Sequence, residues 1–417
     1  MVPSGWRKHR LGNISHAITS GSRDWAQYYS ESGSKFVRMT NLVRDGIYLK
    51  LGDMKYVDVQ SNSADGKRTS LQSGDILISI TAELGKIGWV PNNFGEAYIN
   101  QHTALVRLEL EKVESKYIAY LLSSKTMNHK INRLNDSGAK AGLNLPTIRS
   151  IPLVLPPLPE QQKIAQILSI WDKAISTTES LIANSQQQKK ALMQQLLTGK
   201  KRFAAFDDQW KEKPLSEVAQ VIVSPVDKKT IDGEISVELC NYTDVYYNNT
   251  ITRKIQFMKA TAKQTEIDKY TLKTGDVIIT KDSETPGDIA IPSLVSEDLN
   301  GVLCGYHLAI IRPNSNIIDG SFLNQLFSMH KTRYYFFTLA TGATRFGLSI
   351  GGINKAHFKF PSLAEQQKIA SILLSADQEI ETLQQKLSHL KQEKKALMQQ
   401  LLTGKRRVKV NNETEAA

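Results

Sequence analysis

The sequence predicts an α/β protein: two similar mixed α/β domains held apart by a pair of long antiparallel coiled-coil helices, with a pseudo-two-fold internal repeat. Three observations predict this fold. A block of 41 residues that begins at Glu160 returns without a gap at Glu365, and 24 of the 41 positions are identical. Both blocks carry apolar residues at heptad spacing. The segments that precede the two blocks share short strand-like motifs.

Each repeated block is expected to form one long helix, because its apolar residues alternate between three- and four-residue steps. A helix of about 40 residues is about 60 Å long and cannot cover its apolar stripe alone. Since the second helix leads away from the second domain, we expect the two helices to pair antiparallel within one chain. Pairing with a second molecule is the alternative. The residues expected to pack between the helices are Ile164, Leu168, Trp171, Ile175, Leu192 and Leu196 in the first block and Ile369, Leu373, Ile380, Leu383, Leu387, Leu397 and Leu401 in the second.

These polar residues interrupt the two apolar seams: Thr178, Ser185 and Lys189 in the first block and Lys394 in the second. The repeat predicts five segments: a first domain over 1–158, a first helix over 159–200, a second domain over 201–363, a second helix over 364–405, and a disordered tail over 406–417.

The two domains echo each other in their strand motifs. LQSGDILIS at 71–79 matches LKTGDVIIT at 272–280, and QHTALVR at 101–107 matches YHLAIIR at 306–312. Each pair reads as a β-branched strand, and a Gly-Asp turn precedes the first of them. Helices are expected over Ser115–His129 and Ser321–Tyr335. Between the echoes the loops differ, which is typical of one scaffold that recognises two ligands; neutral drift between duplicated domains is the alternative.

The charge balance favours a polyanionic partner, with an evenly solvated basic surface as the alternative. The net charge of the chain is +12. The first domain carries 20 basic and 13 acidic side chains over residues 1–159, whereas residues 203–364 carry 17 and 18. No apolar run is long enough for a membrane span, and the N-terminus lacks a signal core, so we expect a cytoplasmic protein without membrane contact. The only cysteines, Cys240 and Cys304, are expected to be reduced and buried.

The sequence shows no catalytic or metal-binding motif, so no catalytic or metal-ligating residues are expected. Gly85-Lys86 and Gly199-Lys200 lack the other residues of a phosphate-binding loop. There is no HExxH pattern and no His/Cys cluster at zinc spacing.

The repeated motifs resemble those of a known family. PPLPEQQKIAQIL at 156–168 and FPSLAEQQKIASIL at 360–373 are each followed by KKALMQQLLTGK, at 189–200 and 394–405. With the GDILIS and GDVIIT strands, these motifs resemble the specificity subunit of type I restriction–modification systems over nearly the whole chain.

The resemblance implies two target-recognition domains, each of which binds one half of a split, asymmetric site in double-stranded DNA, and two helices that set the unread spacer. It also implies partners: two methyltransferase (modification) subunits that carry S-adenosylmethionine, and restriction subunits that use ATP and Mg. No cofactor is expected in this chain, which is not an enzyme by itself. The near-neutral second domain departs from the basic surface that DNA binding favours. The alternative function is a non-enzymatic coiled-coil scaffold with two protein-binding heads.

Side chains that read DNA are expected in the loops of the two domains. Arg and Lys suit guanine, Asn and Gln suit adenine, and Lys, Arg and Ser suit phosphate. For each of them a solvated surface group is the alternative. The expected DNA-binding residues are Arg23, Asn41, Lys67, Arg68, Lys86, Asn100, Gln101, Lys140 and Asn144 in the first domain and Lys228, Lys229, Asn241, Lys281, Ser283, His307 and Arg345 in the second. The Gln and Lys faces at Gln186–Lys190 and Gln392–Lys395 are candidate docking surfaces for a partner.

Overall fold

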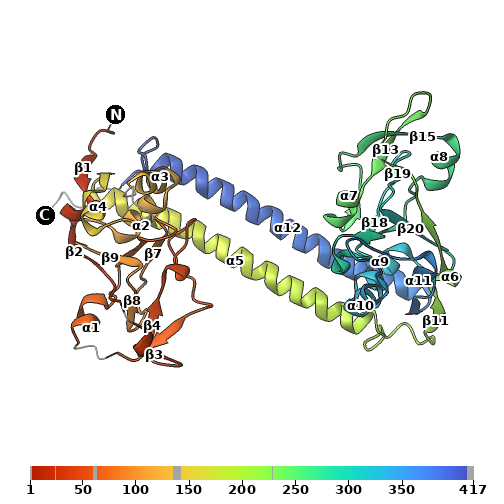
Figure 1. Ribbon diagram of the computed structural model, residues 1–417, viewed down its shortest axis with the longest axis horizontal. Helices are drawn as coiled ribbons and strands as arrows, with labels where there is room; N and C mark the ends of the chain where they lie inside the picture. Colours follow the sequence, from red (N-terminus) through yellow and green to blue (C-terminus); the bar gives the residue numbers. More distant parts are fainter. Residues whose placement is uncertain (1, 24, 60–62, 135–141, 228, 411–417) are drawn as a thin grey trace. The chain divides into compact units, whose positions relative to one another are not determined.

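The computed structural model describes residues 2–23, 25–59, 63–134, 142–227 and 229–410, and part of the expected disordered tail lies outside this range. The chain forms two compact units: unit 1 comprises Met1–Glu179 and Lys386–Ala417, and unit 2 comprises Ser180–Gln385. Two helices of 39 residues, α5 (Leu158–Leu196) and α12 (Leu363–Leu401), each contribute residues to both units (Figure 1). Each unit therefore combines one α/β domain with one stretch of each long helix.

Unit 1 is built on two four-stranded sheets and one two-stranded sheet. The first sheet is antiparallel, in the order β2-β9-β6-β7 (Ser15–Ser20, Thr103–Leu108, Ile76–Ser79, Ile87–Trp89). The second has the order β3-β5-β4-β8 (Tyr29–Ser30, Lys55–Val57, Ser34–Val37, Ala97–Ile99). In the third, β1 (Arg7–Arg10) pairs with β10 (Pro152–Leu155). The helices are η1 (Leu11–Ile14), η2 (Trp25–Tyr28), η3 (Met39–Asn41), α1 (Ala64–Thr69), α2 (Ser115–Ser123), α3 (Lys125–Arg133) and α4 (Leu145–Ser150).

Unit 2 repeats this plan with a larger main sheet. Its five strands have the order β12-β20-β16-β18-β14 (Ala219–Val223, Leu308–Pro313, Val277–Thr280, Pro292–Val295, Thr250–Ile251). The smaller sheets are β15-β13-β19 (Met258–Ala262, Ile235–Cys240, Leu303–Cys304), β11-β22 (Lys211–Pro214, His357–Phe360) and β17-β21 (Asp282–Ser283, Phe346–Gly347). The helices are α6 (Leu215–Val218), α7 (Tyr242–Tyr246), α8 (Gln264–Tyr270), η4 (Pro286–Asp288), α9 (Gly320–Ser328), α10 (His330–Leu339) and α11 (Ile350–Asn354).

The predicted strand motifs form the centre of each main sheet. β6 and β16 follow the two Gly-Asp turns, and all four residues of each strand are buried. In unit 1 the buried Asp75 carboxylate accepts hydrogen bonds from Arg107 Nε at 3.0 Å and Nη2 at 2.8 Å. In unit 2 Asp276 accepts the same pair of bonds from Arg312, at 2.9 and 2.7 Å. The sequence motifs that the two domains share therefore form equivalent structures, and the predicted fold class is confirmed.

The prediction of one helix over Ser115–His129 and one over Ser321–Tyr335 is wrong in one respect, because each region forms two helices. Ser124 separates α2 from α3, and Met329 separates α9 from α10, each with extended backbone. At the first break the Ser124 hydroxyl accepts a hydrogen bond from the Met127 amide at 3.4 Å and caps α3. The apolar pattern hides the break because the helices on both sides of it bury apolar residues in the same core, such as Tyr120 and Ile131 in unit 1.

In unit 1 the long helices run antiparallel. Lys394 of α12 is ion-paired with Asp172 of α5, and Lys391 is paired with Glu179 at 2.8 Å, so the numbering rises on one helix as it falls on the other. Lys394, which the sequence marks as an interruption of the seam, is 8% exposed. The interruption is thus a buried ion pair that fixes the register between the two helices.

Unit 2 contains the equivalent arrangement from the other two stretches of helix. Lys189 Nζ lies 2.5 Å from Asp377 Oδ1, and Ser185 Oγ donates to Glu379 Oε1 at 3.2 Å. Lys189 and Asp377 are the counterparts of Lys394 and Asp172 in the repeat. The expected antiparallel pairing is therefore present in each unit.

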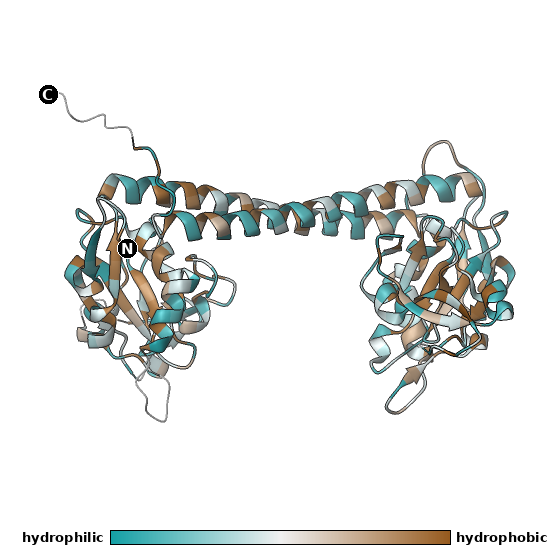
Figure 2. Cartoon of the chain, turned by 90° about the horizontal axis from the view of Figure 1, so that it is seen from above, coloured by the Kyte–Doolittle hydropathy of each residue, from teal (hydrophilic) through white to brown (hydrophobic). Residues whose placement is uncertain are grey.

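The expected packing residues differ in how deeply they are buried. Those near the helix ends join the cores of the domains and are at most 3% exposed: Ile164, Leu168, Leu196, Ile369, Leu373 and Leu401. The remaining ones are half-buried: Trp171, Ile175, Leu192, Ile380, Leu383, Leu387 and Leu397. Figure 2 shows the corresponding mixture of apolar and polar residues along both helices and the apolar strands inside each domain. Two long amphipathic helices leave part of their seam open to water when no further helix covers it.

Cys240 and Cys304 lie at paired positions of the parallel strands β13 and β19 and are fully buried, as expected. Burial raises the pKa of both thiols. Among the residues described here, no helix combines the length and the apolar character that a membrane span requires.

Candidate nucleic-acid interface

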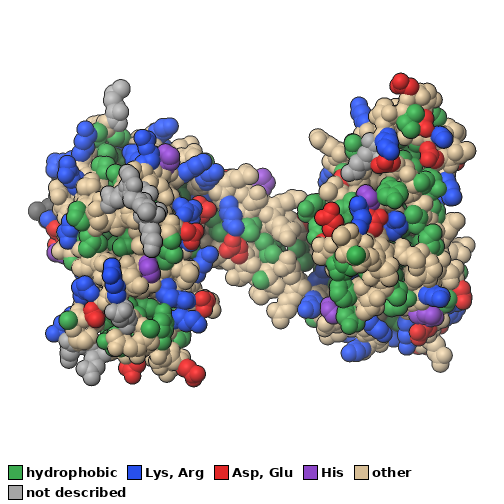
Figure 3. All heavy atoms as spheres, viewed as in Figure 1, with side chains coloured by type: hydrophobic (Ala, Val, Ile, Leu, Met, Phe, Trp, Pro, Cys, Tyr) green, Lys and Arg blue, Asp and Glu red, His purple; other side chains and the backbone are tan. Residues whose placement is uncertain are grey.

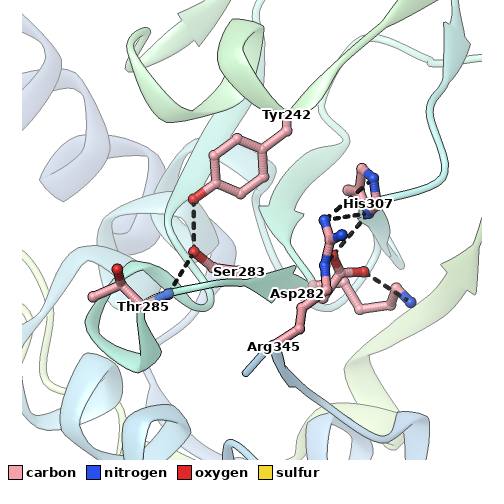
Figure 4. A network of polar contacts seen from close by, with 7 residues as sticks. Tyr242, Asp282, Ser283, Thr285, His307 and Arg345 are labelled. Carbon is pink, nitrogen blue, oxygen red and sulfur yellow. Dashed lines mark hydrogen bonds and ion pairs between the residues drawn. The ribbon is translucent and has the colours of Figure 1, made fainter. Parts of the chain in front are cut away.

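In unit 2, several expected DNA-binding residues gather where the main sheet ends (Figure 4). β16 and β20 are neighbours, and the Lys281 amide that follows β16 donates to the carbonyl of His307, which precedes β20, at 2.9 Å. The loop before β21 brings Arg345 to the same place, because β21 pairs with β17. Residues that are distant in sequence therefore meet at one edge of the sheet.

The cluster is organised around one carboxylate. Asp282 Oδ1 lies 2.8 Å from His307 Nδ1 and 3.0 Å from Arg345 Nε, and Asp282 Oδ2 lies 3.4 Å from Lys281 Nζ. The Asp282 side chain is 11% exposed, whereas that of Arg345 is 53% exposed. Three residues expected from the sequence thus converge on Asp282, which sequence reasoning missed. Asp282 stands between two expected residues, Lys281 and Ser283, but its role depends on the pairing of β17 with β21, which the sequence pattern does not reveal.

Ser283, which is expected to contact DNA, has hydrogen-bond partners within the fold. Its side chain is nearly buried, and its Oγ accepts hydrogen bonds from Tyr242 Oη and from the Thr285 amide, both at 3.2 Å (Figure 4). Burial raises the pKa of the Tyr242 phenol.

Further contacts fix the loop that follows Ser283. Tyr246 Oη donates to Asp288 Oδ1 at 3.3 Å, and the Arg333 guanidinium donates to the carbonyls of Gly287, at 2.7 Å, and Ile289. Burial lowers the pKa of Arg333. The loop over residues 282–288 is therefore held from α7 on one side and α10 on the other.

Unit 1 uses the same scaffold with a hydroxyl in place of the carboxylate. The Ile80 amide donates to the His102 carbonyl at 3.1 Å, as Lys281 does to His307. Thr81 Oγ1, at the place of the Asp282 carboxylate, lies 2.8 Å from His102 Nδ1. Asn128, the counterpart of Arg333, donates to the Gly85 carbonyl at 2.5 Å. The same frame thus presents different chemistry in the two domains.

A second group of expected residues gathers in unit 1 beside α1. Arg68 Nη2 is 3.1 Å from Asp65 Oδ1 and also contacts Ser22 Oγ. The backbone of Ser22 forms an isolated β-bridge with that of Asn100. Asn100 Oδ1 accepts from the His102 amide at 3.2 Å. Arg23, next to Ser22, and Lys67, next to Arg68, are exposed. Gln101, next to Asn100, is half-buried. Lys67 and Arg68 lie in a helix and not in the loop that the sequence suggested.

Two of the asparagines expected to contact DNA are buried and hydrogen-bonded within the fold. Asn41 is 2% exposed; it accepts a hydrogen bond from the Arg38 amide at 2.9 Å and donates to the Lys50 carbonyl at 2.8 Å. Asn241 is 9% exposed and donates to the Leu239 carbonyl at 3.3 Å. Both polar side chains serve turns of the fold, because buried amides are satisfied internally.

The other expected residues are spread over the surface. Asn144 caps α4 by accepting from the Thr147 amide at 2.8 Å, and Lys86 is ion-paired with Glu83. Lys229 is exposed and 3.4 Å from Asp227. Lys140 and Lys228 lie outside the described residues.

The charged side chains follow the balance of the sequence. On the face of unit 1 drawn in Figure 3, Lys and Arg side chains are more numerous than Asp and Glu, whereas acidic side chains are mixed among them on the face of unit 2. Within the described ranges, no group of three or more His, Cys, Asp or Glu side chains could hold a metal ion.

The candidate docking surfaces on the long helices are smaller than expected. Lys189 and Lys394 face the other helix in their ion pairs. The neighbouring side chains Gln186, Gln187, Gln188, Lys190, Gln392, Glu393 and Lys395 are exposed.

Comparisons with known proteins point in one direction. A family model described as the type I restriction modification DNA specificity domain matches twice, over residues 3–184 and 207–392. The chain is 24% identical to the type I restriction enzyme MjaVIII specificity subunit of Methanocaldococcus jannaschii, over 98% of this chain and 94% of that protein. It is 26% identical to the putative type I restriction enzyme MjaX specificity subunit of the same organism, over 98% and 95%.

Solved structures share the fold. The S subunit of a type I restriction–modification system from M. genitalium superposes with a TM-score of 0.61 and 15% identity, over 96% of both chains. A second structure superposes with a TM-score of 0.55 and 17% identity, over 96% of this chain and 98% of the other. Its title concerns complex assembly and conformational transition of the type I R-M system.

Proposed function

Because this chain belongs to the family defined by the type I restriction modification DNA specificity domain, we propose that it is the subunit that gives such a system its DNA sequence specificity. It recognises a bipartite, asymmetric site in double-stranded DNA, with one half-site for each α/β domain. The observation that carries this proposal is that the specificity domain occurs twice on one scaffold whose loop chemistry differs between the copies.

The contacts of the two domains support unlike half-sites. A Thr81–His102 pair, with a hydroxyl in place of the carboxylate, stands where the second domain has Asp282 with His307 and Arg345. Hydrogen-bond patterns in the major groove differ between base pairs, so different donors and acceptors on the same frame select different bases. One duplicated scaffold can thus read two sequences in one binding event.

The net charges suggest a division of labour in binding. The first domain, with its excess of basic side chains, contributes more of the phosphate attraction that dominates affinity. The second domain, which is nearly neutral overall, contributes through the local cluster of Lys281, His307 and Arg345. Binding by the whole chain is then salt-sensitive.

The chemistry belongs to partner subunits in this proposal. The subunit is not catalytic by itself; it directs methylation by two modification subunits that carry S-adenosylmethionine, and restriction by motor subunits that use ATP and Mg. The internal repeat supports two copies of one partner, because each unit presents an equivalent stretch of paired helices with its own Lys–Asp contact. The exposed Gln and Lys side chains on those helices are candidate contacts. The complex acts in the cytoplasm, where chromosomal DNA is accessible.

The test is to co-express the chain with a type I methyltransferase chain encoded beside it and to map methylated adenines across the host genome. The expected result is methylation confined to one split motif with two unlike halves, which disappears when either chain is omitted. Methylation without a defined motif would contradict the proposal. Retention of random duplex DNA on a filter at low salt separates this function from a protein-binding scaffold, which should retain none.

A further inference from the structure

We infer that Arg345, positioned by Asp282, reads a guanine in the half-site bound by unit 2. This inference rests on the proposed function and deepens it, since it names one base and the side chain that selects it. It comes from the geometry of the cluster in Figure 4, in which a buried carboxylate holds one edge of an exposed guanidinium.

The orientation of Arg345 is fixed from one side. Its Nε is 3.0 Å from Asp282 Oδ1, and its Nη2 lies 3.2 Å from His307 Nδ1. Asp282 is itself immobilised, because it lies in β17 and its Oδ1 is 2.8 Å from His307 Nδ1. A guanidinium that is already oriented loses less conformational entropy when it binds than a free lysine or arginine does.

The exposed part of Arg345 suits one base better than the others. With more than half of its side chain exposed, the guanidinium can present two N–H donors to a ligand. Guanine is the base that offers two acceptors, N7 and O6, side by side in the major groove. Adenine, cytosine and thymine each place a donor or a methyl group at one of these positions. A bidentate contact therefore selects guanine.

The cluster has features that a simple phosphate contact does not need. A phosphate accepts from any nearby cation, and its binding gains nothing from a carboxylate that offsets the charge. The Asp282 carboxylate lowers the local positive charge while it fixes the plane of the guanidinium. At the matching place in unit 1 the Thr81 hydroxyl stands in place of the carboxylate, so the same device is not built there. Base selection, rather than general attraction, explains why unit 2 holds the carboxylate.

The test uses the assembled complex of this chain with its methyltransferase partner, after the methylated motif has been mapped. Duplexes are synthesised in which each guanine of the motif is replaced, one at a time, by 7-deazaguanine, which keeps O6 but lacks the N7 acceptor. The wild-type complex is expected to bind one of these duplexes about tenfold more weakly than the natural duplex, because a bidentate base contact contributes about 1–3 kcal/mol. Arg345→Ala is expected to bind both duplexes equally.

Asp282→Asn tests the positioning role separately. It keeps the size of the side chain but removes the charge that orients Arg345, so discrimination between guanine and 7-deazaguanine should fall about threefold or more. Binding to random DNA should not weaken, because the loss of a carboxylate raises the local positive charge. Arg253→Ala is the matched control, because Arg253 is also an exposed arginine of unit 2 ion-paired with a carboxylate, that of Glu238. This variant should keep the full discrimination. The thermal unfolding midpoint of each variant checks that the domain remains folded.

The outcomes separate the inference from the function on which it rests. If the wild-type complex shows no split motif, the proposed function fails. If the motif is split but Arg345→Ala keeps the discrimination at every guanine, or weakens all duplexes by the same factor, Arg345 contacts phosphate and the inference is overturned. A single position at which discrimination is lost both in Arg345→Ala and, in part, in Asp282→Asn supports it.

Discussion

Arg407 donates two hydrogen bonds of 2.7 Å, from Nε and Nη2, to the carboxylate of Glu160, 247 residues earlier in the chain. In unit 2, Arg202 makes the same pair of bonds to Glu365, at 3.1 and 2.6 Å. Glu160 and Glu365 open the two repeated blocks, and each arginine follows the end of the other block. In each unit, the start of one block therefore binds an arginine just beyond the end of the other.

Glu160→Gln should destabilise unit 1 by about 1–3 kcal/mol. The Glu160 side chain is 4% exposed, so the substitution weakens a largely buried charged contact, although the effect is reduced because Arg407 is 44% exposed to water. The measurement is the free energy of unfolding from urea denaturation, followed by a signal from the tryptophans.

Glu179→Gln is the matched control, because Glu179 forms an ion pair with Lys391 in the same helix pair but both side chains are about half exposed. Its effect should stay within about 0.5 kcal/mol. Equal losses for Glu160→Gln and Glu179→Gln would mean that the pair at the domain junction contributes no more than an ordinary surface contact.

Gly404→Ala should destabilise the chain by about 1–3 kcal/mol, since an L side chain is strained in a left-handed backbone conformation. Gly404 has φ +71°, and an added Cβ would lie 2.5 Å from Pro3 Cγ and 3.2 Å from the Trp6 ring. Gly199 of unit 2 has φ +70°, and an added Cβ would meet the Trp210 ring. Gly199→Ala should therefore lower stability by a similar amount.

Gly351→Ala is the control for this pair of glycines. Gly351 lies in α11, and an added Cβ would meet no atom within 4 Å. Its substitution should leave the thermal unfolding midpoint unchanged or raise it, because alanine favours the helix. A loss of stability there as large as at Gly404 would remove backbone strain as the explanation.

The architecture could be predicted from the sequence because its causes are local or repeated. The heptad spacing around Leu168 and Leu373 required a partner helix, and the repeat supplied one. The Lys–Asp pairs that set the register were also visible in principle. Asp172 and Asp377 are identical in the two blocks, as are Lys189 and Lys394, and antiparallel pairing places each lysine opposite the other block's aspartate.

The interface was predicted less completely, because side-chain burial depends on packing that residue type does not reveal. Asn41 and Asn241 look like base-reading amides in the sequence, yet both support turns of the backbone. Arg345 and His307 are 38 residues apart. The pairing of β17 with β21 brings Arg345 to Asp282, and the pairing of β16 with β20 brings His307 there. Such a cluster cannot be recognised before the sheet pairing is known.

Lys67→Ala should weaken binding to all duplexes by a similar factor and lower the salt dependence of the affinity by about one unit of slope. Lys67 is exposed in the last turn of α1, on the more basic of the two domains, where a flexible ammonium suits a phosphate better than a base. The measurement is the affinity of the assembled complex at several salt concentrations. Lys163→Ala, an exposed lysine of α5 in the same unit, is the control and should leave the slope unchanged. A change in the preferred sequence with Lys67→Ala would show a base contact instead.

The length of the long helices should set the number of unread base pairs between the two half-sites. Seven residues inserted between Ala183 and Gln187 in α5, with seven more next to Glu379 in α12, keep the heptad seam, because Ser185 and Glu379 are in contact. The insertion adds about 10 Å of helix, equivalent to about three base pairs. Methylome mapping of the co-expressed complex should then show both half-sites unchanged and a spacer longer by about that amount.

Two further variants serve as controls for this prediction. Replacing the same seven-residue stretch without a change of length should leave the spacer as it was. Insertion in α5 alone shifts Lys189 away from Asp377 and should lower the unfolding midpoint, because the two seams then fall out of register. Altered half-sites in the doubly extended chain would mean that the helices take part in reading bases, and an unaltered spacer would mean that they do not set its length.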